Sequence, residues 1–112
     1  MSNYTYFIAF EDDVTPEGFT AHNIIYNLPV CDLAEAFDEF DINWYDKCGI
    51  ITDVEAYAKV LLEPYLSEAT HEYIDDEGDS DGKTTLQVLY DFLMKWQAYK
   101  IMVFSEPHYF NS

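Results

Sequence analysis

The sequence has no arginine, only five lysines and no long hydrophobic run. Without arginine it lacks the usual bidentate clamp for phosphate or carboxylate groups, so phosphoryl transfer is not expected. No apolar stretch approaches the roughly 20 residues that a membrane span needs. The apolar segment 6–10 runs into the acidic residues 11–13, and no basic signal-peptide region precedes it. We therefore expect a cytoplasmic protein with no membrane partner.

Residue types that carry chemistry are also scarce. Cys31 and Cys48 are the only cysteines, and neither belongs to a CxxC motif or to a Cys/His pair at zinc spacing. This favours two reduced thiols in the core, with a disulfide between them as the alternative. The three histidines are scattered, and no GxSxG, HExxH, P-loop or dinucleotide-binding motif occurs. We expect no enzymatic activity and no cofactor.

What the chain has in excess is negative charge and aromatic side chains. The 22 acidic residues give a formal net charge of -17, while 18% of the 112 residues are aromatic. An acidic chain poor in apolar groups would be disordered, because it could not bury enough surface to offset its conformational entropy. Here the aromatic residues supply a core. The composition therefore predicts one folded domain, residues 1–112, with a strongly anionic surface.

Hydrophobic patterning predicts an α+β fold. Segment 4–10 is apolar on both faces, as in a central strand, and segment 19–28 is expected to return beside it as a hairpin. Residues 84–98 are apolar nearly all round and predict the core helix, followed by a last strand over 100–104. Segment 42–51 is ambiguous between a loop and a short strand. The prediction is a small, mostly antiparallel sheet of three to four strands, covered on one face by two to three helices.

Two further helices are predicted from capping patterns. Asp32 and Glu35 resemble a capping box that opens a helix over about 33–40. Thr52 and Glu55 form a cleaner capping box for a second helix. Pro64 is expected to kink this second helix, or to begin a new helical segment that continues to about Tyr73.

The segment 75–82, DDEGDSDG, predicts an exposed loop. Its alternating acids resemble part of a calcium-binding EF-hand loop, with acids and a glycine at matching positions from Glu77 to Gly82. The position that needs a bidentate glutamate is instead Val88. A solvated loop is therefore the preferred interpretation, and a weak, irregular divalent-cation site is the alternative.

Candidate partner-binding residues follow from the charge pattern. Glu35, Asp38 and Glu39 form a row on the first helix, with neighbouring carboxylates about 5–6 Å apart. Trp44 and Tyr45 lie between two aspartates and are the best candidates for an aromatic anchor, although packing at an edge of the sheet is the preferred interpretation of this pair. The complete set is Glu35, Asp38, Glu39, Asp41, Trp44, Tyr45, Asp46, Asp75, Asp76, Glu77, Asp79 and Asp81.

Because self-repulsion makes such a charge costly to a compact fold, the charge calls for a benefit. The first hypothesis is a DNA mimic that occupies the groove of a basic, nucleic-acid-binding host protein. In charge, size and aromatic content the chain resembles the small phage-borne inhibitors of restriction enzymes and CRISPR effectors, and the inhibitors of uracil-DNA glycosylase. This resemblance identifies no shared motif and no site residues.

Two alternatives remain open. One is an acidic adaptor or antitoxin that binds a basic protein without imitating DNA. The other is a salt-adapted soluble domain, whose acidic surface maintains hydration. The sequence leaves open whether the domain forms a homodimer through its aromatic residues.

Overall fold

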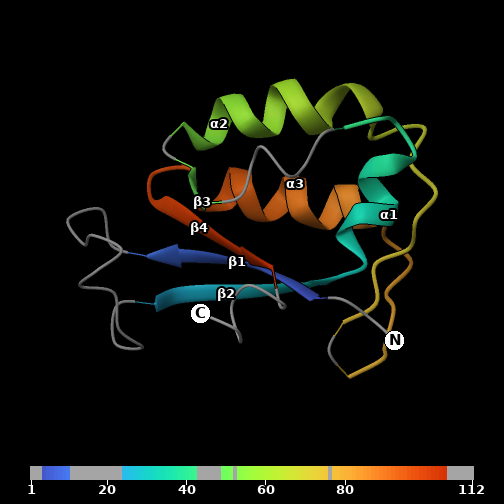
Figure 1. The fold of residues 1–112 in the computed structure, drawn as a ribbon, viewed down its shortest axis with the longest axis horizontal. Helices are drawn as coiled ribbons and strands as arrows, with labels where there is room; N and C mark the ends of the chain where they lie inside the picture. The colour runs from blue at the N-terminus through green and yellow to red at the C-terminus, as the bar shows by residue number, and fades with distance from the viewer. Residues whose placement is uncertain (1–3, 11–23, 43–48, 52, 76, 106–112) are drawn as a thin grey trace.

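The chain pairs its first and second strands as a hairpin and inserts its last strand on the other side of the first (Figure 1). The computed structural model describes residues 4–10, 24–42, 49–51, 53–75 and 77–105. β1 (Tyr4–Phe10) pairs with β2 (Ile24–Cys31) and with β4 (Lys100–Ser105), and β4 pairs with β3 (Gly49–Ile51). All pairings are antiparallel, and the strand order is β2-β1-β4-β3.

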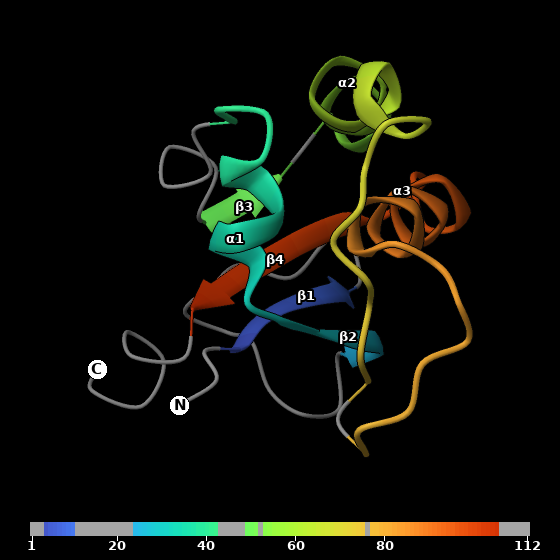
Figure 2. The ribbon, with the colours of Figure 1, turned by 90° about the vertical axis from the view of Figure 1, so that its right-hand side faces the viewer.

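Helices cover one face of this sheet (Figure 2). They are α1 (Leu33–Asp38), α2 (Val54–Tyr57) with its continuations η4 (Ala58–Leu62) and η5 (Glu63–Tyr65), and α3 (Thr85–Lys95). Sheet and helices share one hydrophobic core, so the elements form a single compact unit. The predicted α+β class, with an antiparallel sheet covered on one face, is confirmed.

The central position of β1 explains why both of its faces are apolar. Phe7 and Ala9 face the helices and belong to the main core, whereas Ile8 and Phe10 form a second, smaller cluster with Met102 on the other face. Each of these residues is buried. Because β1 has a neighbouring strand on each side and buried residues on both faces, it has few solvent-facing positions to fill with polar residues.

The predicted core helix is confirmed as α3. Thr84 caps it by accepting a hydrogen bond from the backbone N–H of Gln87 at 3.2 Å. Its buried side chains are Thr85, Leu86, Leu89, Phe92 and Leu93. The helix ends at Lys95, three residues before the predicted end.

Both capping predictions for the other helices need correction. Asp32 precedes α1, but its backbone is left-handed (φ 54°) and its side chain makes no capping hydrogen bond. The cap of α2 is Asp53, whose Oδ1 accepts from the N–H of Ala56 at 3.2 Å; the predicted Thr52 lies outside the described residues. Sequence spacing locates a helix start to within a residue or two, and the local backbone decides which oxygen turns inward.

Pro64 changes the helix that contains it. A proline has no N–H and its ring clashes with the carbonyl four residues earlier, so a regular α-helix cannot pass through it. Here the α-helix widens into the π-helical η4 before Pro64 and tightens into the 3-10 helix η5 around it. The predicted continuation to Tyr73 is wrong. Helical structure ends at Tyr65, and Glu72 forms an isolated antiparallel bridge with Thr84.

The remaining bounds differ in smaller ways. α1 ends at Asp38, two residues before its predicted end, and β2 extends beyond the predicted Leu28 to Cys31. The ambiguous segment 42–51 ends in a short strand, β3. Among the described residues, no helix is long and apolar enough to cross a membrane.

Candidate acidic interface

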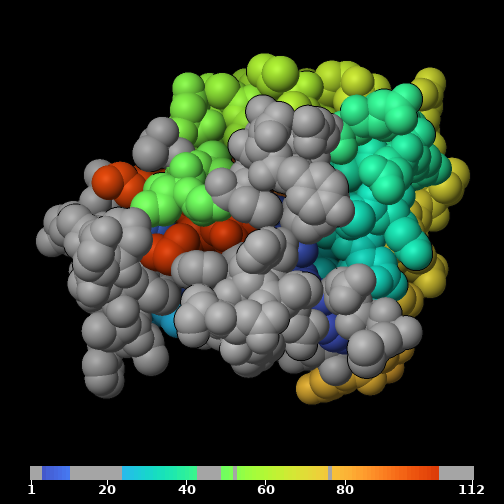
Figure 3. Space-filling model, in the orientation of Figure 1, coloured from blue at the N-terminus to red at the C-terminus, as the bar shows by residue number. Residues whose placement is uncertain are grey.

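Helix α1 presents its carboxylates on the side away from the core. Its apolar residues Leu33, Ala36 and Phe37 are buried, so the helix is fixed on the domain by that face. Glu35, Asp38, Glu39 and Asp41 are all exposed on its other side and in the turn that follows. In the space-filling view, α1 forms a broad part of the surface next to α2 (Figure 3).

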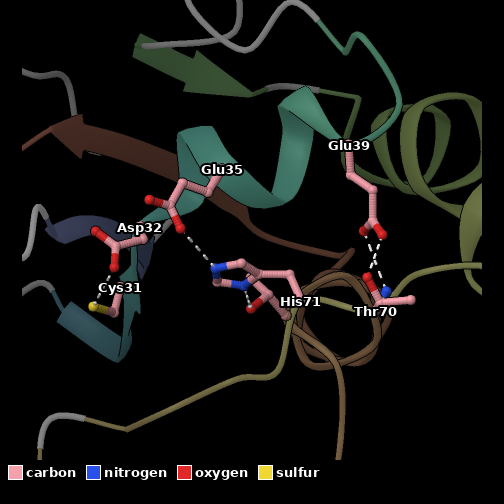
Figure 4. Close-up of polar contacts among 7 residues, drawn as sticks. Cys31, Asp32, Glu35, Glu39, Thr70 and His71 are labelled. Atoms are coloured by element: carbon pink, nitrogen blue, oxygen red, sulfur yellow. Dashed lines mark hydrogen bonds and ion pairs between the residues drawn. The ribbon is translucent and has the colours of Figure 1, made fainter.

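Glu39 has a partner within the chain. Its carboxylate accepts hydrogen bonds from the hydroxyl of Thr70 and from the N–H of Thr70, the latter at 3.2 Å. These bonds favour the charged form and hold the pKa of Glu39 below its usual range, with a smaller contribution from His71. Glu39 therefore joins the end of α1 to the segment that follows η5 (Figure 4).

Glu35 makes a second connection to the same segment. Its Oε2 lies 3.6 Å from Nε2 of His71. The other ring nitrogen of His71 lies 2.8 Å from Oγ1 of Thr85 at the start of α3, and the N–H of Thr85 donates to the carbonyl of His71 at 2.8 Å. Figure 4 shows Glu35 of α1 and Glu39, which follows the helix, both pointing toward this segment. The predicted row is therefore partly engaged in joining α1 to the rest of the fold.

Asp38 and Asp41 differ from these glutamates. Within the part of the chain that the structure describes, their carboxylates make no hydrogen bond or ion pair, and both residues are exposed. Asp41 has a left-handed backbone (φ 58°), a conformation that aspartate and asparagine tolerate better than most residues. Of the α1 group, these two carboxylates are the ones left for a partner.

Residues 77–82 of the acidic loop are exposed as predicted, but the carboxylates of the loop are not equivalent. Asp75 is half-buried, and its Oδ1 accepts from the N–H groups of Glu77 at 2.9 Å and Asp79 at 2.8 Å. Asp81 accepts from the N–H of Lys83 at 3.2 Å. Glu77 and Asp79 are exposed, whereas Asp76 lies outside the described residues.

These contacts bear on the alternative of a calcium site. Asp75 and Asp81 use carboxylate oxygens to order the backbone of their own loop. Within the described residues, no group of three or more His, Cys, Asp or Glu side chains is arranged to hold a metal ion. Asp75 and Asp81 therefore act as turn-forming side chains.

Trp44, Tyr45 and Asp46 fall outside the described residues, so their role stays a prediction. Of the two cysteines, Cys31 is half-buried at the end of β2 and its thiol donates to Oδ2 of Asp32 at 3.5 Å. Cys48 also falls outside the described residues.

A second acidic group, which sequence reasoning missed, surrounds Tyr90. The Tyr90 hydroxyl donates to Oε2 of Glu63 at 3.2 Å. Partial burial raises the pKa of Tyr90 above its usual value, and the hydrogen bond to Glu63 and the charges of Glu63, Asp91 and Glu55 add to the effect. The three carboxylates come from α2, η5 and α3. No sequence signal could have found this group, because only the packing of α2 and η5 against α3 brings it together.

The surface as a whole is anionic. Asp32 and Asp75 are half-buried, and every other carboxylate in the described residues is exposed. Against a net charge of -17, the described cations are Lys59, Lys83, Lys95 and Lys100, and Lys83 is paired with Asp91 at 3.7 Å.

Searches of protein families, curated proteins and solved structures found no match to this chain.

Proposed function

We propose that the protein is a non-enzymatic inhibitor that acts as a DNA mimic in the cytoplasm. It occupies the basic nucleic-acid-binding groove of a host protein, and defence proteins such as a CRISPR effector or a restriction enzyme are the target class that fits best. The observation that carries the proposal is the exposed carboxylate surface, which spans α1, α2, η5, α3 and the loop 75–82. It binds no membrane and no nucleic acid directly.

Charge and size support this proposal. Duplex DNA carries one charge per about 1.7 Å of axis, so a charge of -17 equals that of roughly eight or nine base pairs. That length of duplex spans about 29 Å at about 3.4 Å per base pair. The protein measures 38 × 31 × 26 Å. A groove that accommodates this length of DNA would meet a similar charge over a similar distance.

Rigidity supports α1 as the main contact. Its carboxylates stand on a helix that is fixed by Leu33, Ala36 and Phe37 in the core and joined to the Thr70–His71 segment by Glu35 and Glu39. A surface that is ordered before binding loses less entropy when the complex forms. We therefore assign Asp38 and Asp41 to the contact with the target, with the loop 75–82 as the alternative position.

The first test identifies the partner. The tagged protein captures proteins from a host lysate at low salt, and bound proteins are released by stepwise salt and by added DNA duplex. The expected result is a nucleic-acid-binding protein that duplex displaces. Capture of a basic protein that duplex does not displace would contradict mimicry and indicate the adaptor or antitoxin. Capture of nothing would leave solubility as the role of the charge.

The second test locates the contact with two variants of equal charge. The α1 variant, Asp38→Asn with Asp41→Asn, removes two carboxylates from the end of α1 and the turn that follows it, and Glu77→Gln with Asp79→Asn removes two from the loop. Exposed charges contribute about 0.2–1 kcal/mol each, so the α1 variant should weaken target binding about 2- to 30-fold. The loop variant should have a smaller effect. Equal weakening would show that only net charge matters, and a larger loss in the loop variant would move the contact there.

A further inference from the structure

We draw no further inference here: the strongest candidate, the exposed aromatic face where Tyr26 of β2 stacks on Trp96 at the end of α3, carries nothing because nothing in the structure shows what covers it.

Discussion

The hydroxyl of Thr84 should account for a measurable part of the stability of the domain. It caps the N-terminus of α3, the helix that supplies much of the core. Thr84→Ala removes the oxygen that accepts from the N–H of Gln87 at 3.2 Å, and loss of such a cap costs about 1 kcal/mol, within a range of about 0.5–2 kcal/mol. Thr84→Ser keeps the oxygen and removes only the methyl group, so it is the matched control.

The size of the effect in a thermal melt follows from the length of the chain. An unfolding entropy of about 2.1 cal/mol/K per residue gives about 0.24 kcal/mol/K for 112 residues. A loss of about 1 kcal/mol therefore lowers Tm by about 4 °C, and the range of cap energies corresponds to about 2–8 °C. Circular dichroism of reversible unfolding measures the shift. An unchanged Tm in Thr84→Ala would refute the contribution of the cap, and an equal loss in Thr84→Ser would assign it to packing of the methyl group.

Two further predictions concern α1. The pKa of Glu39 is lowered in the folded state, so its contribution to stability is complete above the unfolded-state pKa of about 4.3 and is lost as pH falls through the lower folded-state pKa. Urea unfolding at a series of pH values should show that Glu39→Gln lacks this acid-dependent loss of stability. If the free energy of unfolding falls with pH as steeply in Glu39→Gln as in the parent protein, the prediction is contradicted. Asp32 has a left-handed backbone, so Asp32→Ser should destabilise the fold by about 1 kcal/mol while Asp32→Gly should not. Equal stability of Asp32→Ser and the parent protein in the same assay would contradict this prediction.

The fold was largely predictable where hydrophobic periodicity is strong. Segment 4–10 is apolar on both faces because it lies between two strands and has buried residues on each face, and few other positions in a fold give this pattern. α3 is apolar around most of its circumference because it packs over the sheet and against α2 and η4. Burial on such a scale constrains every position of a segment, so it is visible in the sequence.

Helix ends were harder to predict, because their determinants are local and small. Asp32 and Asp53 both suit a capping position, yet only Asp53 turns its oxygen toward the helix. The prediction of a helical segment continuing after Pro64 was wrong for another reason. Beyond Tyr65 the chain is no longer helical, and Thr70 and His71 contact the carboxylates of Glu39 and Glu35. Glu39 and Thr70 are more than thirty residues apart in the sequence, so no local pattern indicates this contact.

The sequence alone determined the charge, the exposure of most carboxylates and the supply of aromatic residues for a core, because these properties depend on composition and on which face of an element is apolar. Only the tertiary structure decided how the carboxylates are used. It joined Glu35 and Glu39 to a distant segment, left Asp38 and Asp41 exposed, gathered three carboxylates around Tyr90 and placed Tyr26 against Trp96. Each of these arrangements depends on contacts between elements far apart in the chain, which no local pattern encodes.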